Sequence, residues 1–189
     1  MKEPKLQREL KRRAKVDREG RTVLIEWIQQ HGLHNVVGTG SLSEVQKAEY
    51  ERARARVSEI DAENTKWLQD VVKQYGWPTI SLVGEKGKKA AWLLVQHADA
   101  EPSFQRYCLD LMLKQPKNEV SQSKLAYLKD RVLLAEGKSQ LYGTQFTFVD
   151  GKWQPFPLED AVNVDKRRAE VELPTLAENI KQIEKRYGK

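Results

Sequence analysis

Residues 88–98 read KKAAWLLVQHA, and this run decides the fold of the chain. Six consecutive small or apolar residues, Ala90–Val95, cover nearly the whole circumference of the run when it is drawn as a helix. A helix that is apolar almost all round is stable only when other elements bury it. The run therefore predicts a central, buried helix in a mainly α protein.

Start and stop signals on both sides of this run predict further helices. The first extends from about Leu6 to the region of Gly32. A capping box of Ser43 and Gln46 begins a long, charged helix that ends near Tyr75. We expect residues 79–83 to be extended or a short strand and residues 84–87 to be a turn. Later helices are expected at residues 102–113 and 121–137, after Asn163 and after Pro174.

An Asp150-Gly151 pair between β-rich flanks predicts a hairpin. The predicted fold class is thus mainly α, a single-domain helical bundle with a small β-hairpin near residues 146–156. Along the chain we divide it into a basic N-terminal helix (1–30), a Gly-rich loop (31–43) and a helical core (44–189).

The composition favours a soluble protein with much exposed helix, because 39% of the 189 residues are hydrophobic and 32% are charged. No apolar run approaches the ~20 residues of a membrane span. The basic N-terminus has no apolar stretch behind it, so we expect no signal peptide and no membrane partner. The single cysteine, Cys108, lies in an apolar helical pattern and is expected in the core. These features together predict a cytoplasmic protein.

The net charge of +6 is concentrated at the N-terminus. Residues 1–21 hold nine Lys or Arg and four acids, a net of +5, which leaves +1 for the other 168 residues. Such a helix is either a solvated face or an arm that binds phosphate groups. Nucleic acid is therefore a candidate partner.

His97 is the first candidate for chemistry. It sits at the C-terminal end of the central helix, where the helix dipole favours a protonated imidazole, and Gln96 and Asp99 flank it. A histidine that a carboxylate orients is a good general acid or base near neutral pH. The alternative is a core histidine whose two nitrogens are both satisfied.

Asp130 is the second candidate, because it lies in a mostly apolar helix where an unpaired carboxylate would be costly. Arg131 is poorly placed to pair with it, so we look to His97, Arg21 or a ligand. A structural ion pair and a catalytic or ligand-binding carboxylate both fit this position.

The loop 139–145 is the third candidate. Gln140, Tyr142, Thr144 and Gln145 offer uncharged donors and acceptors, which suit a neutral polar ligand such as an amide, a sugar or a peptide. The alternative is a loop that hydrogen-bonds its own backbone. No metal site is predicted, because the His97 and Asp99 spacing suits one helix face poorly. No cofactor motif is found, so no cofactor is expected.

Several short stretches resemble an uncharacterised bacterial family called domain of unknown function 6624. They lie in order between about residues 60 and 180: GWP at 76–78, SLVG at 81–84, AAWLLVQHAD at 90–99, FQ at 104–105, YLKDR at 127–131, QLYGTQ at 140–145, ED at 159–160 and VDKRR at 164–168. The N-terminal helix is also similar. Asp17 and Arg21 fit the family's pattern there, whereas Arg18 replaces a glutamine.

The resemblance implies a shared polar site built from Asp17, His97, Asp99, Gln105, Asp130, Gln140 and Gln145, but no activity. The candidate catalytic residues are His97, Asp99 and Asp130. We expect the site where the C-terminal end of the 88–98 helix meets the loop 138–146. The candidate ligand-binding residues are Asp17, Arg21, Gln96, Gln105, Arg131, Gln140, Tyr142, Thr144 and Gln145.

Three functions fit these residues. The first is binding of a polar small molecule or peptide. The second is metal-independent hydrolysis or group transfer, with His97 as general acid or base and Asp99 or Asp130 as its carboxylate. The third is association with nucleic acid through the basic helix at residues 2–21.

Overall fold

The computed structural model describes residues 1–32 and 42–187. These residues form seven helices and one two-stranded antiparallel sheet, so the predicted mainly α fold with a small hairpin is confirmed. Most of the predicted Gly-rich loop, residues 31–43, lies outside the described ranges.

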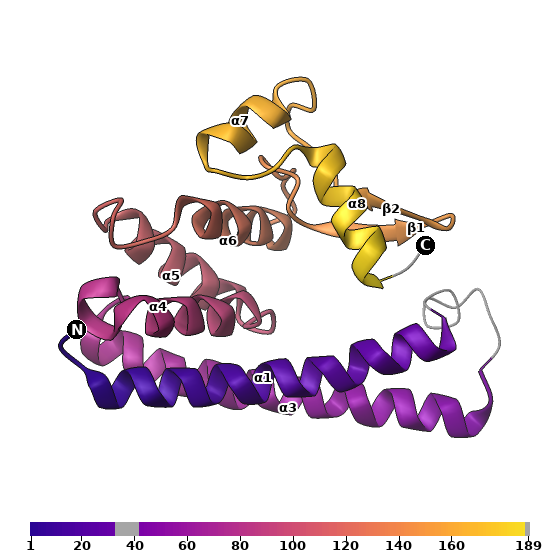
Figure 1. Cartoon of the computed structure of the whole chain (residues 1–189), viewed down its shortest axis with the longest axis horizontal. Coiled ribbons are helices and arrows are strands. Elements are labelled where there is room, and N and C mark those ends of the chain that lie inside the picture. Colours follow the sequence, from indigo (N-terminus) through magenta and orange to yellow (C-terminus); the bar gives the residue numbers. More distant parts are fainter. Residues whose placement is uncertain (33–41, 188–189) are drawn as a thin grey trace.

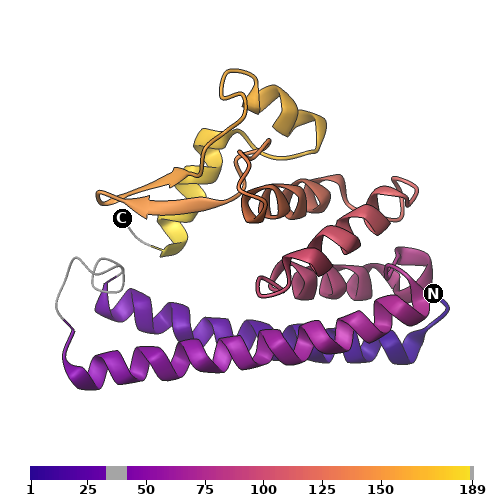
Figure 2. The same cartoon turned by 180° about the vertical axis from the view of Figure 1, so that it is seen from behind.

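A long helical hairpin forms the base of the molecule. Helices α1 (Pro4–His31) and α3 (Glu44–Tyr75) lie side by side over most of their length (Figures 1 and 2). The predicted capping box begins α3, because the Ser43 hydroxyl accepts from the Gln46 N–H and the Gln46 side chain accepts from the Ser43 N–H. Gly76, at φ 71°, ends it.

Helix α4 (Ile80–Gln96) packs along α1 and contains the opening run of the sequence (Figure 1). The strand predicted at residues 79–83 is wrong. Thr79 instead caps a first helical turn by accepting from the Leu82 N–H, and Gly84 then kinks the helix with a left-handed φ of 69°. Gly84 thus separates the first helical turn from the main part of α4, and the residues that follow it are helical instead of forming the predicted turn.

Two shorter helices, α5 (Pro102–Leu113) and α6 (Gln122–Ala135), cover the other side of α4, close to their predicted positions. The core lies between these layers. It is formed by completely or almost completely buried side chains from five helices, among them Leu10, Leu68, Ala91, Leu94, Val95, Cys108, Leu109 and Leu128.

The C-terminal part is a small αβ layer. Strands β1 (Phe146–Val149) and β2 (Lys152–Pro155) pair with Phe146 opposite Pro155, as the Asp150-Gly151 turn predicted. Helices α7 (Val164–Glu170) and α8 (Leu176–Tyr187) follow. The Gln29 amide on α1 donates to the Arg186 carbonyl at 2.7 Å and so joins this layer to the base. None of the described helices has the length and apolar content that crossing a membrane requires.

Cys108 reports on the integrity of this core. Its side chain is completely buried, and burial raises the pKa of its thiol to about 12. At pH 8 we expect the native protein to resist thiol reagents, because the reactive thiolate is almost absent and the sulfur is shielded. Unfolding in guanidinium chloride should release one rapidly reacting thiol. Fast labelling of the native protein would contradict the packing of α5 against α4.

Candidate functional site

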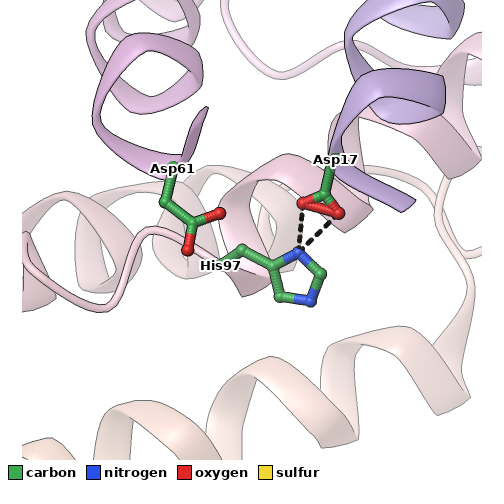
Figure 3. A group of neighbouring side chains, drawn as sticks. All are labelled: Asp17, Asp61 and His97. Atoms are coloured by element: carbon green, nitrogen blue, oxygen red, sulfur yellow. Dashed lines mark hydrogen bonds and ion pairs between the residues drawn. The ribbon is translucent and has the colours of Figure 1, made fainter. Parts of the chain in front are cut away.

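The site centres on a contact between a buried carboxylate of α1 and the histidine at the end of α4. Asp17 is 1% exposed and lies one turn beyond Ala14 on the inner face of α1. His97 is the C-cap of α4, and its Nδ1 lies 2.6 and 3.0 Å from the two Asp17 oxygens (Figure 3). The carboxylate that orients His97 therefore comes from a helix 80 residues earlier in the chain.

Arg21 and Asp61 complete the cluster. The Arg21 Nη2 donates to both Asp61 oxygens at 2.6 and 2.7 Å, and its Nε lies 2.9 Å from His97 Nδ1 and 3.4 Å from Asp17. One guanidinium thus contacts a carboxylate from α1, a carboxylate from α3 and the imidazole. Burial raises the pKa of the Asp61 carboxyl, and the Arg21 charge opposes that effect.

Two tautomers of the neutral His97 ring would use these neighbours differently. A proton on Nδ1 would be donated to the shielded Asp17 carboxylate at 2.6 Å and would leave the lone pair on Nε2. A proton on Nε2 would instead let Nδ1 accept from the Arg21 Nε–H at 2.9 Å, with its lone pair also close to the Asp17 oxygen. Figure 3 shows Nε2 turned away from both carboxylates.

A cavity of about 610 Å³ adjoins the ring. Helix α3 supplies much of its wall, and Leu24 and the segment 97–101 supply the rest. The lining mixes small apolar groups with polar and charged ones, including Ser58, Asp61, Thr65, Lys66 and Gln69. His97 is 20% exposed by side chain and lies in this wall.

A divalent metal is the natural alternative occupant of the cluster. Ligand atoms of Asp17, Asp61 and His97 all lie within 4.8 Å of one another, and two carboxylates with an imidazole suit a transition metal. Arg21 already contacts all three side chains, and its guanidinium provides the positive charge that balances the two carboxylates. A metal ion would have to displace its guanidinium.

The carboxylates predicted to act on His97 have other partners. Asp99 is 59% exposed by side chain and accepts from the Arg131 guanidinium at 2.7 and 2.8 Å and from the Gln105 amide at 3.1 Å. Asp130 is fully buried and accepts from the backbone N–H groups of Leu141, Tyr142 and Thr144. It contacts neither His97 nor Arg21, because these amides and the Thr144 hydroxyl surround its two oxygens.

The polar loop at residues 139–145 is held largely by hydrogen bonds to its own part of the chain. Gln140 is fully buried, and its side chain bonds the backbone of Gln145 and Phe156. The alternative of a self-satisfied loop therefore describes Gln140, whereas the Thr144 hydroxyl donates to Asp130 on α6 at 2.9 Å. Gln145 lines a second hollow, and Thr144 and Gln145 both line a further one of about 450 Å³.

This second hollow, of about 420 Å³, gathers four predicted ligand-binding or catalytic residues: Asp99, Gln105, Arg131 and Gln145. It lies where the end of α4 meets the 138–146 loop. That a ligand site occupies this place stays a prediction. Tyr142 is half-buried beside this region without lining the hollow. The buried Gln96 Nε2 has no hydrogen-bond partner among the described residues.

Asp61 is the residue that the sequence-based prediction missed. It lies between Val57 and Leu68 on the face of α3 that also carries Ile60 and Asn64. The inner-face positions of α3 are three and four residues apart, and a carboxylate at one of them indicates a shielded and hence candidate functional group. Asp61 was overlooked because α3 contains many other charged residues.

The model of a family of unknown function (DUF6624) matches residues 44–189. The chain belongs to this family. The DUF6624 match includes Asp61, His97 and the second hollow, whereas Asp17 and Arg21 lie on α1, outside the matched residues. No curated protein and no solved structure matches the chain.

Matched substitutions separate the roles of the two predicted carboxylates. Asp130→Asn should lower the free energy of unfolding by about 3 kcal/mol. Both oxygens of the native carboxylate accept hydrogen bonds, whereas the NH2 group of an amide would face N–H donors. Asp99→Asn should change it by less than about 1 kcal/mol, since the Asp99 side chain is 59% exposed and its charge is screened by solvent. Chemical denaturation measures both. Equal effects would contradict the structural role of Asp130.

Proposed function

We propose that the 610 Å³ cavity is an active site in which His97 acts as general acid and base in a metal-independent hydrolysis or group transfer. The observation that carries the proposal is the Asp17–His97 contact at 2.6 Å beside an open cavity. Asp17 replaces the Asp99 and Asp130 of the sequence-based hypothesis as the orienting carboxylate.

The chemistry follows from the charges. With Nδ1–H held by Asp17, Nε2 accepts a proton from a water or hydroxyl in the cavity, and the imidazolium that forms lies against a carboxylate. Arg21 binds Asp61 and approaches Asp17, which keeps the orienting carboxylate in place. The proton then returns from Nε2 to the leaving group. Ser58, Thr65 and Gln69 in the wall suit a polar substrate.

The second hollow supports another candidate function, the binding of a neutral polar ligand or a peptide. The half-buried Gln145 places its amide beside the Arg131–Asp99 ion pair, and Phe146 and Phe156 give the hollow an apolar side. Gln105 is 1% exposed and donates its amide N–H groups to the Val95 carbonyl and to Asp99. Binding here would require no proton transfer by His97. The basic face of α1 contributes to neither the cavity nor this hollow.

Substitution of His97 tests the proposed activity. Hydrolysis of a panel of chromogenic carboxylic esters, anilides, phosphodiesters and glycosides should include a substrate whose turnover falls by at least about 100-fold in His97→Gln. Asp17→Asn should lower the same rate. His31→Gln is the matched control, because that ring stacks on Trp27 outside the cavity lining.

Turnover that survives His97→Gln unchanged would contradict the proposal. If instead the panel gives no turnover, and calorimetry finds a peptide or sugar whose binding is lost in Gln145→Ala but kept in His97→Gln, the second candidate is favoured. Gln154→Ala, on the exposed side of β2, is the control for that comparison.

A further inference from the structure

A basic groove lies between α1 and α4, apart from the His97 cavity. It holds about 380 Å³, and five exposed cationic side chains line it: Lys11, Lys15, Arg18, Lys86 and Lys89. The other two lining residues, Ala14 and Ala90, are buried and form its floor. Among the residues that the structure describes, no acidic and no large apolar side chain belongs to this lining.

Helix geometry aligns these charges. Lys11, Lys15 and Arg18 are four and three residues apart, so they follow one face of α1 over roughly 10 Å. Lys86 and Lys89 are three residues apart on α4, which lies beside α1 in both views (Figures 1 and 2). Small alanines between the two rows leave a hollow with positive charge along both edges.

Most of this charge is not neutralised within the described residues. Lys15 pairs with Glu19 at 3.6 Å, and both side chains are mostly exposed. The other four cations of the groove have no carboxylate within ion-pair distance in the described ranges. Five like charges around one hollow repel one another, and an anionic ligand would relieve that repulsion.

The positive region continues from Lys89 onto α6. The Lys124 Nζ lies 3.7 Å from the centre of the Trp92 ring and is partly shielded there. Burial, followed by the charge of Lys89, lowers the pKa of Lys124. The cationic side chains therefore extend from α1 across α4 to α6, although the lowered pKa reduces the contribution of Lys124 to this charge.

We propose that the α1–α4 groove binds the sugar-phosphate backbone of nucleic acid. A concave channel with cations along two edges complements a phosphate ridge, which carries closely spaced charges. The groove offers no large apolar side chain that could enter a bilayer, which disfavours a lipid surface. It also offers no amide or aromatic group that could recognise or stack on a base. Binding is therefore independent of sequence.

Salt dependence tests the assignment. Fluorescence anisotropy with a labelled 20-base-pair duplex should give a slope of log K against log salt of about −4 to −5, if the five cations each neutralise one phosphate. Lys86→Gln/Lys89→Gln should reduce that slope by about 2 and weaken binding about tenfold or more at moderate salt. Both residues are exposed, so the fold should persist.

Lys152→Gln/Lys166→Gln is the control pair, since it removes the same charge from exposed positions on β2 and α7. It should keep the slope and bind within about twofold of the parent. Equal losses in the two pairs would overturn the groove assignment, as would no binding at 50 mM salt. Preferential binding to phosphatidylserine vesicles over the duplex would also overturn it.

Discussion

Asp17 carries a carboxylate that is almost completely shielded from solvent, and an unpaired charge at this position would be costly. His97 from the end of α4 and Arg21 from the next turn of α1 meet it, and Arg21 also binds Asp61 on α3. The packing of three helices is therefore tied to one electrostatic requirement. The same contacts hold the His97 ring, with Nε2 directed away from both carboxylates (Figure 3).

A second buried charge organises the C-terminal part in a similar way. Asp130 binds the N–H groups of the loop that precedes the hairpin. Arg168 is equally buried and donates to the Tyr142 and Gly143 carbonyls of the same loop and to Asn179 on α8. The loop is thus held between an anion and a cation, each satisfied by groups of the opposite polarity. This arrangement keeps Gln145 and Phe146 at the edge of the second hollow.

The sequence predicted what depends on local chemistry. The Ser43–Gln46 capping box, the Asp150-Gly151 turn and the apolar run at Ala90–Val95 act within a few residues, and the elements they predicted are present. The prediction for residues 79–87 was wrong because a kink in a helix and a turn between two elements both favour a glycine with a left-handed φ. His97 was found as a candidate by its place at the end of a buried helix.

The partner of His97 could not be found in the same way. The packing of α1 against α4 decides which carboxylate reaches it, and that packing joins residues 80 positions apart. The resemblance to DUF6624 did place Asp17 in the polar site, without showing its contact. The conformation of the loop at residues 141–144 brings backbone N–H groups to Asp130. The residue types in that loop therefore do not predict this contact.

The tautomer of His97 tests the central claim most directly. Long-range ¹H–¹⁵N correlation spectra of the imidazole distinguish a protonated from an unprotonated nitrogen. At a pH where the ring is neutral, the account predicts a proton on Nδ1 and a free Nε2, with that preference weakened in Asp17→Asn. A neutral ring protonated on Nε2, with Nδ1 accepting from the Arg21 Nε–H, would contradict the proposed general base.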